Sequence, residues 1–137
     1  MLSTLLYADN FLGRSLVGRI SQGTAKANQQ IKAINLDGKK VDEGRLTKIF
    51  RYEGTKKVPI DKGEAGDIVI IAGLEKANVA DTICDLEIND PINATPIDPP
   101  TMSITITVNS SPLAGTEGKK LTSTQIRDRL ILEAENN

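Results

Sequence analysis

The sequence predicts a mainly β fold, a six-stranded antiparallel barrel followed by a truncated α+β segment. Nine of the eleven glycines fall within the first ninety residues, and turn signals at this spacing are typical of short strands in a barrel or sandwich. Hydrophobic residues make up 39% of the chain and aromatic residues only 3%, so we expect an aliphatic core. Four of the six prolines lie between residues 91 and 100, where the strand pattern ends.

Six segments before this break have the composition of β-strands. They are Leu2–Tyr7, Arg14–Ser21, Gln30–Leu36, Arg45–Tyr52, Asp67–Ala72 and Thr82–Leu86. Residues 68–72 are all apolar, which predicts a central strand covered on both faces. The pair Asp37-Gly38 predicts a tight turn, because both residues tolerate a positive φ.

Alternation along Arg45–Tyr52 predicts the direction of its side chains. Successive side chains of a strand lie on opposite faces, so Leu46, Phe50 and Tyr52 are expected on one face. Ile49 is expected on the opposite face. Both expectations treat the segment as one straight strand.

The proline-rich stretch predicts the domain organisation. Proline cannot donate a hydrogen bond to a β-ladder and it stiffens the chain, so residues 93–100 are interpreted as an extended linker. Residues 1–92 then form the barrel domain. Residues 101–137 form a second unit that consists of a strand, a loop and a helix.

Two patterns define this second unit. From Met102 to Val108, apolar and hydroxyl side chains alternate, which predicts a half-buried antiparallel strand. Thr122 lies three residues before Gln125, the spacing of a capping box at the start of a helix. One strand and one helix cannot bury a core by themselves. We therefore interpret residues 101–137 as the N-terminal part of a larger domain, unless a partner chain completes it.

Composition excludes several kinds of chemistry. The chain has no histidine and a single cysteine, Cys84. A Ser-His-Asp triad, a histidine-ligated metal, an internal disulfide and a multi-cysteine zinc site are therefore excluded. No apolar run reaches the roughly 18–20 residues that span a membrane, and the first thirty residues lack the apolar core of a signal peptide. We expect a cytoplasmic protein without a membrane partner.

One stretch invites comparison with a nucleotide site, residues 115–120, Gly-Thr-Glu-Gly-Lys-Lys. A phosphate-binding loop needs four residues between its glycines and a Ser or Thr after the lysine. Here two residues separate the glycines, and Lys120 stands where the hydroxyl is required. The acidic pairs Asp42/Glu43 and Glu133/Glu135 are interpreted as solvated surface. We therefore expect no catalytic, metal or cofactor-binding residues in this chain.

Positive charge is concentrated in the first part of the sequence. Residues 1–60 contain eleven Lys or Arg and five Asp or Glu, which gives a net charge of +6. Residues 61–100 contain two Lys or Arg and nine Asp or Glu, which gives a net charge of −7. A basic stretch can form a surface that meets phosphates, and it can equally reflect neighbouring strands that pair opposite charges. Because aromatic residues are few, we expect contacts with the backbone and shape of structured RNA and not base stacking.

Several segments resemble one protein family. Residues 13–23, Gly-Arg-Ser-Leu-Val-Gly-Arg-Ile-Ser-Gln-Gly, resemble the opening strands of the β-barrel second domain of translational GTPases. Residues 63–74 resemble the Ala-Gly-Asp-Ile-Val strand of that domain, and residues 81–84 look like its closing strand. The segments similar to the start of the third domain in the TypA/BipA branch are residues 100–103, 111–119 and 122–130.

Two positions depart from the family pattern at turns. Asn28 stands where the barrel usually has a turn glycine, and asparagine tolerates left-handed geometry. Ala80 replaces the glycine that precedes Asp81. Since alanine accepts a positive φ poorly, we expect this second turn to be reshaped.

The resemblance implies a translation-factor β-barrel, domain II, followed by the start of an elongation-factor-like domain III. It also implies a parent protein whose GTP-binding domain, missing here, holds GTP and Mg²⁺ and hydrolyses GTP on the ribosome. In such proteins the barrel touches the rRNA of the small subunit, and TypA/BipA-like factors are associated with ribosome assembly and stress adaptation. This chain is then expected to position its parent and not to catalyse.

The resulting hypothesis is a non-catalytic ribosome-docking module that contacts rRNA and the missing G domain. The residues predicted to contact rRNA phosphates are Arg14, Arg19, Lys39, Lys40 and Arg51. The alternative is a purely structural barrel that binds only its neighbouring domains, without RNA contact. An independent enzyme that uses carboxylates would need two acidic residues that converge in a pocket.

Overall fold

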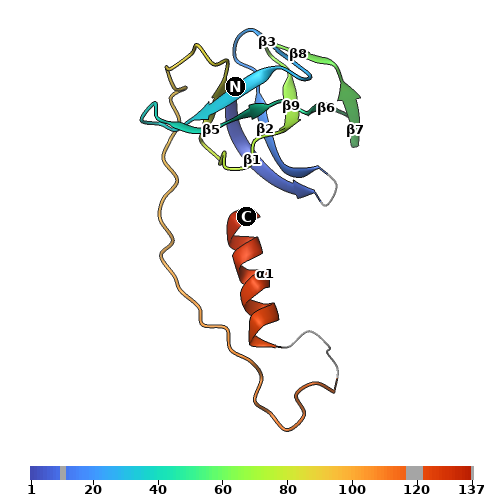
Figure 1. The fold of residues 1–137 in the computed structure, drawn as a ribbon, viewed down its shortest axis with the longest axis vertical. Coiled ribbons are helices and arrows are strands. Elements are labelled where there is room, and N and C mark those ends of the chain that lie inside the picture. The colour runs from blue at the N-terminus through green and yellow to red at the C-terminus, as the bar shows by residue number, and fades with distance from the viewer. Residues whose placement is uncertain (10–11, 117–121, 137) are drawn as a thin grey trace. The chain divides into compact units, whose positions relative to one another are not determined.

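The computed structural model describes residues 1–9, 12–116 and 122–136. The chain divides into two units, residues 1–97 and 98–137, and this division falls within the stretch interpreted as a linker. The first unit contains the β-strands and the second contains one helix (Figure 1). The Gly118-Lys119-Lys120 part of the stretch compared with a phosphate-binding loop lies outside the described residues.

The first unit is mainly β, as predicted. Its strands are β1 (Leu2–Asp9), β2 (Gly13–Arg19), β3 (Thr24–Lys26), β4 (Gln30–Ile34), β5 (Lys40–Arg45), β6 (Lys48–Glu53), β7 (Lys56–Ile60), β8 (Lys62–Glu64), β9 (Ile68–Ala72) and β10 (Thr82–Cys84). Eight of them form a sheet in the order β5-β4-β10-β1-β2-β9-β6-β7, and β3 pairs with β8. Every pairing is antiparallel.

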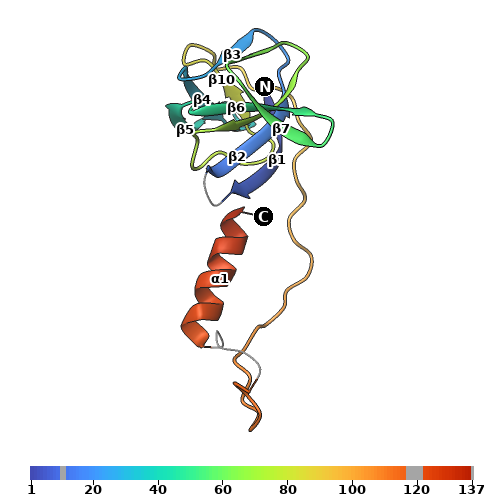
Figure 2. The same ribbon diagram turned by 90° about the vertical axis from the view of Figure 1, so that its right-hand side faces the viewer.

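The sheet closes into a barrel because β5 and β6 are consecutive parts of one bent chain. β5 pairs with β4, and β6 pairs with β9. At the bend, the Leu46 N–H donates to the Gln29 carbonyl at 2.9 Å, and the Thr47 N–H donates to the Ala72 carbonyl at 2.8 Å. If the bent chain is counted once, the ring has the six members that the sequence predicted: β4, β10, β1, β2, β9 and β5–β6 (Figure 2).

The bend also corrects the predicted side-chain directions. Leu46 and Ile49 were expected on opposite faces, but both belong to the core and each is only 1% exposed. The expectation is wrong because alternation is interrupted where the chain passes from one strand to the next. Phe50 and Tyr52 keep the predicted alternation relative to Ile49, and they lie outside the core cluster.

The core lies inside this ring and is aliphatic. Its buried members come from β2, β4, β6, β9, β10 and the segments between strands, namely Leu16, Ile20, Ile31, Ala33, Leu46, Ile49, Val69, Ile71, Leu74, Ala77 and Ile83. β9 lies between β2 and β6, and its residues from Val69 to Ala72 are at most 3% exposed. The prediction of a central strand covered on both faces is confirmed for Val69–Ala72, whereas Ile68, at the start of the strand, is 59% exposed.

Four strands were not predicted: β3, β5, β7 and β8. β3 and β8 pair only with each other, β5 pairs only with β4, and β7 pairs only with β6. Strands with one partner can be polar, and β5 reads Lys-Val-Asp-Glu-Gly-Arg. β7 contains Pro59, which an edge strand tolerates because the missing N–H has no ladder partner there.

Three turns test the predictions about positive φ. Gly38 has a φ of 77°, and its N–H donates to the Asn35 carbonyl at 3.0 Å, which confirms the tight turn. Asn28 has a φ of 66° and takes the place of a turn glycine without difficulty. Ala80 has a φ of 70°. The expectation that this last turn is reshaped is therefore wrong, because alanine adopts the left-handed conformation itself.

Replacement of Ala80 by glycine is expected to stabilise the barrel by about 0.5–1 kcal/mol. Glycine removes the roughly 1–2 kcal/mol cost of a left-handed Cβ, and part of this gain is offset because glycine gives the unfolded chain more freedom. Urea denaturation measures the change in the free energy of unfolding. The matched control is Ala65→Gly at an exposed turn position outside the positive-φ set, where a loss of stability is expected. A loss in both variants would contradict the prediction.

The second unit differs from its prediction in one respect. Helix α1 (Ser123–Asn136) is present, and its capping box is confirmed, since the Gln125 N–H donates to Thr122 Oγ1 at 3.4 Å and the Thr122 N–H donates to Gln125 Oε1 at 3.3 Å. The half-buried strand over Met102–Val108 is wrong: these residues form no strand, and Met102 is 88% exposed. Alternation alone is insufficient, because a strand needs a neighbour to pair its backbone.

Candidate nucleic-acid interface

The structure places the five residues predicted to contact phosphates at separate positions on the barrel. Arg14 and Arg19 lie at opposite ends of β2, and Arg51 lies on β6. Lys39 belongs to the turn after β4, and Lys40 begins β5. No single surface contains all five.

Arg14 makes contacts inside the barrel domain. Its half-buried guanidinium donates from Nε to the Ala77 carbonyl at 2.9 Å, and from Nη2 to Asn78 Oδ1. The same loop is held by Asp81, whose carboxylate accepts the Asn78 N–H at 2.7 Å. Burial raises the pKa of the Asp81 carboxyl. Arg14 therefore fastens the loop before β10 to β2, and its predicted contact with RNA stays a prediction.

Lys39 and Lys40 lie at the β4–β5 hairpin. Asn35 builds this turn, because its Oδ1 accepts the N–H groups of Asp37 at 3.0 Å and Lys39 at 2.9 Å. Both lysines are exposed, and Lys40 Nζ forms an ion pair with Glu43 at 3.0 Å. Lys39 is therefore the better placed of the two to meet an external anion.

Arg51 is also paired with a carboxylate. Its guanidinium lies 2.8 Å from Glu53, and the hydrogen bond to Glu53 raises the pKa of Arg51. Arg51 is opposite the inward-facing Val69 in the β6–β9 register, whereas Arg19 is opposite Ile68 in the β2–β9 register. Because directly opposite residues share a face, Arg19 and Arg51 lie on different faces of the sheet.

Arg19 belongs to the outward-facing side of the sheet, where cross-strand rows of residues run over five strands. Leu5, Val17, Ile70, Phe50 and Pro59 are opposite one another in turn on β1, β2, β9, β6 and β7. Leu5 is 54% exposed at the β1 end of this row, and Ile68 on the neighbouring row is 59% exposed. The outward side of these strands is thus partly apolar.

Three of the four aromatic residues lie on this same side. Tyr7 follows Leu5 by two positions and Tyr52 follows Phe50 by two positions, so each pair shares a face. A hydrogen bond to Tyr7 raises the pKa of the Tyr52 hydroxyl, and this contact spans β2 and β9, which separate β1 from β6. The expectation of RNA contact without base stacking stays a prediction, and Tyr7, Phe50 and Tyr52 are the aromatic side chains that share this face.

Cations surround the aromatic residues. Lys57 Nζ lies 5.0 Å from the centre of the Tyr7 ring, within the range of a cation–π contact. Lys48 lies in the same cross-strand row as Tyr7. In this row Tyr7 is opposite Ser15, Ser15 is opposite Ala72, and Ala72 is opposite Lys48. We call this surface the outer face, and we define it by Leu5, Tyr7, Arg19, Lys48, Phe50, Tyr52, Lys57 and Ile68.

Among the described side chains, the charged groups of the outer face are all cations. It contains Arg19, Lys48 and Lys57, and among the described side chains none of these three has an ion pair with a carboxylate. At the outward positions of these five strands, the described side chains include no Asp or Glu. This combination of cations and exposed tyrosines suits nucleic acid, because phosphates meet the cations and bases stack on the rings.

Comparisons with known proteins agree with this fold. Residues 13–84 match the family model described as elongation factor Tu domain 2, which covers more than half of the chain. The chain belongs to the elongation factor Tu domain 2 family. The resemblance to translational GTPases stated from the sequence is confirmed for this domain.

Curated relatives identify the branch of this family. The chain is 42% identical to "Large ribosomal subunit assembly factor BipA" of Bacillus subtilis (strain 168) over 92% of its own length, and 42% identical to the protein of the same name in Synechocystis sp. over 98%. The Escherichia coli O157:H7 protein is 40% identical over 94%. The resemblance to the TypA/BipA branch is confirmed. The chain spans about a fifth of the length of these relatives, 20–22%.

Other kinds of site were sought in the same structure. Among the described residues, no three His, Cys, Asp or Glu side chains are grouped so that they could hold a metal ion. The helix within the described ranges is too short and too polar to cross a membrane. The outer face is thus the surface whose chemistry points most directly to a ligand.

Proposed function

We propose that this chain is the non-catalytic ribosome-docking module of a TypA/BipA-type translational GTPase, and that its outer face contacts rRNA of the small subunit. The observation that carries the proposal is the outer face itself, where three cations without a carboxylate partner among the described side chains share a face with two exposed tyrosines. Family membership supports a role in a translational GTPase, and the name of the relatives, large ribosomal subunit assembly factor, supports a ribosomal partner. Because that name refers to the other subunit, both subunits belong in the test.

The rest of the proposal concerns the parent protein. GTP and Mg²⁺ would be held by its G domain, and the barrel would keep that domain at a fixed angle on the ribosome in the cytoplasm. Residues 1–92 would be domain II, residues 93–100 the linker and residues 101–137 the start of domain III. The exposed aliphatic residues of α1, Leu130, Ile131 and Leu132, fit a helix that packs against further parts of such a domain.

Salt-dependent binding tests the outer face. A labelled chain is titrated with isolated small and large ribosomal subunits between 50 and 300 mM KCl, and log K is plotted against log salt. In the double variant Arg19→Ala/Lys57→Ala, the slope is expected to become shallower by about one to two units, because each lost phosphate contact removes roughly 0.7–0.9 of a unit. Both residues are exposed, so the variant is expected to remain folded.

Two further variants complete this experiment. Lys26→Ala/Lys76→Ala removes the same charge from exposed positions that do not belong to the outer face and that have no ion pair among the described side chains, and its slope is expected to stay within about 0.5 unit of the parent. Lys40→Ala/Arg51→Ala removes two cations that already have carboxylate partners, so a change below about one unit is expected. Equal slopes in all three variants would remove the outer face from the proposal.

The exposed Leu5 and Ile68 favour a second candidate function, a barrel that binds only neighbouring domains. Apolar side chains exposed together on one face are suited to protein contacts. The G domain of a relative, supplied as a separate chain, distinguishes the two functions. Binding of that G domain without affinity for either ribosomal subunit would support the purely structural barrel.

A further inference from the structure

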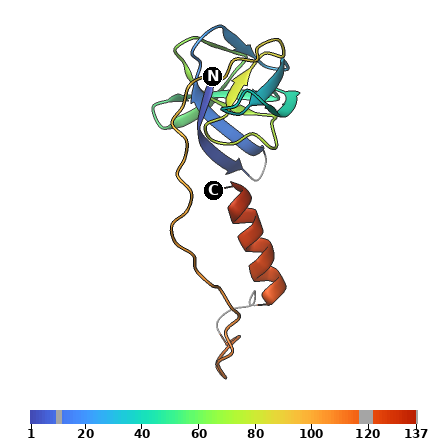
Figure 3. The same ribbon diagram turned by 90° about the vertical axis from the view of Figure 1, so that its left-hand side faces the viewer.

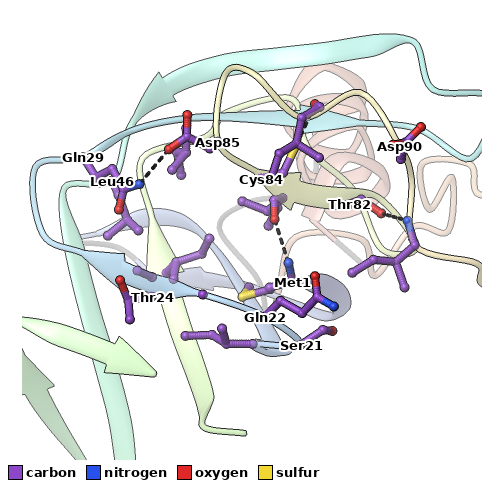
Figure 4. Close-up of a pocket in the computed structure, with 18 residues that line it drawn as sticks. Met1, Ser21, Gln22, Thr24, Gln29, Leu46, Thr82, Cys84, Asp85 and Asp90 are labelled. Carbon is purple, nitrogen blue, oxygen red and sulfur yellow. Dashed lines mark hydrogen bonds between the residues drawn. The ribbon is translucent and has the colours of Figure 1, made fainter. Parts of the chain in front are cut away.

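A cavity of about 700 Å³ opens at one end of the barrel, and it shares no residue with the outer face (Figure 4). Its floor consists of core residues, namely Ile20, Ile31, Leu46, Ile71 and Ile83. Its walls include Met1, residues 21–25 and residues 82–92. The volume falls within the range of ordinary ligand pockets, roughly 300–1,000 Å³.

The wall formed by residues 85–92 is held in place at several points. The Ile92 N–H donates to Thr82 Oγ1 at 2.8 Å, and Cys84 Sγ donates to the Ile88 carbonyl at 3.4 Å. Lys32, only 6% exposed, donates from Nζ to Asn89 Oδ1 at 2.8 Å. A buried lysine thus fastens this wall through its ammonium group.

The rim of the cavity is acidic. Asp85 and Asp90 line it, and the Asp85 carboxylate accepts the Gln29 amide at 3.1 Å (Figure 4). None of the lining residues is a lysine or an arginine. The lining contains two carboxylates and one cation, the Met1 ammonium, so the net charge of the rim disfavours nucleic acid and favours a cationic partner.

The beginning of β1 pairs with β10 beside this floor (Figure 3). The Met1 ammonium donates to the Ile83 carbonyl at 2.7 Å (Figure 4), while the Met1 side chain packs against the core. Burial lowers the pKa of this ammonium group.

We propose that the cavity binds a basic protein segment, with an aliphatic side chain on the isoleucine floor and an adjacent Lys or Arg at Asp85 and Asp90. The apolar floor and the acidic rim belong to one cavity, so a single segment can meet both. The barrel then has two binding surfaces of opposite charge, the outer face for RNA and the cavity for protein. This inference does not rest on the proposed RNA contact.

A peptide titration tests the proposal with the full chain. The probe is a fluorescent Arg-Leu-Lys-Leu-Arg peptide, and its matched controls are Glu-Leu-Glu-Leu-Glu and Arg-Ser-Lys-Ser-Arg. Saturable binding of the probe is expected, with both controls at least about tenfold weaker, because one lacks the charge for the rim and the other lacks the side chains for the floor. Equal binding of the acidic or the serine peptide would overturn the proposal.

Variants locate the binding. Asp85→Asn/Asp90→Asn keeps the shape of the rim and is expected to weaken the probe about tenfold, and Ser21→Trp is expected to block the cavity with a similar or larger loss. The control Asp37→Asn/Asp61→Asn changes two exposed carboxylates outside the lining and is expected to alter the dissociation constant less than twofold. A loss of the same size in this control, or unchanged binding to Ser21→Trp, would overturn the site.

Two further readouts separate this site from the other proposals. The Arg19→Ala/Lys57→Ala variant is expected to bind the peptide as the parent chain does, so failure of RNA binding and failure of peptide binding are distinguishable. Sedimentation of the chain alone examines the other occupant of such a cavity, a second copy. Dimer formation that Ser21→Trp abolishes would assign the cavity to self-association and overturn the proposal.

Discussion

Replacement of Gly73 by alanine is expected to destabilise the barrel by about 4 kcal/mol or more. Gly73 has a φ of 127°, and a Cβ built on it would lie 2.0 Å from the Arg45 carbonyl oxygen. A side chain there combines the cost of a left-handed backbone with a collision against main chain that cannot move aside. This contact lies at the corner where β5 turns into β6 and closes the ring, so the loss should appear as a lower urea midpoint for the whole β unit.

The control for this variant is Gly54→Ala, in the turn between β6 and β7. Gly54 also has a positive φ, 63°, but a Cβ there would meet nothing within 4 Å. The Gly54→Ala variant is expected to lose only the conformational cost of a left-handed alanine, about 1–2 kcal/mol of unfolding free energy. Equal losses at Gly73 and Gly54 would show that the close approach of the two chains at the corner is absent.

Loss of the Arg14 side chain is the second large effect, with an expected destabilisation of about 2 kcal/mol for Arg14→Ala. The guanidinium holds the Ala77 carbonyl and the Asn78 side chain, and hydrogen bonds of charged groups contribute about 1.5–3 kcal/mol. Its removal leaves the loop before β10 without its attachment to β2. Urea denaturation measures the change, and amide hydrogen exchange at residues 77–81 is expected to accelerate.

Arg19→Ala is the matched control, since it removes the same side chain from the opposite end of the same strand. Because Arg19 is exposed, the free energy of unfolding of Arg19→Ala is expected to change by less than about 0.5 kcal/mol. The affinity of this variant for ribosomal subunits is expected to fall. Arg14→Ala is expected to lose stability and to keep its affinity for ribosomal subunits, when binding is measured at a temperature where the variant is folded. An equal loss of ribosome affinity in both variants would show that Arg14 also contacts RNA, and would contradict this prediction.

The strands that the sequence predicted correctly are those that bury side chains. Residues 68–72 were recognisable because a strand covered on both faces is apolar throughout. β5 and β7 were missed because each has only one neighbour, so polar residues and Pro59 are compatible with pairing. The strand predicted over Met102–Val108 is wrong for the opposite reason. Its side chains alternate as they do in a half-buried strand, but alternation does not supply a neighbouring strand to pair with its backbone.

The candidate site was harder to predict than the fold. Lysine and arginine positions are visible in the sequence, but their partners are not: Arg14 holds a loop, Lys32 holds the cavity wall, and Arg51 faces Glu53. The outer face joins Tyr7 and Lys57, fifty residues apart in the chain. Such a contact depends on strand order and register, which composition does not contain.

The sequence alone determined the class of fold, the central strand, the Asp37-Gly38 turn and the membership of a family. These follow from local chemistry, because side-chain periodicity and backbone freedom act over a few neighbouring residues. Only the tertiary structure decided how β5 and β6 close the ring, why Ala80 keeps a left-handed turn, and which cations lack a carboxylate partner. These depend on which distant segments lie next to each other, and that is set by packing of the whole core.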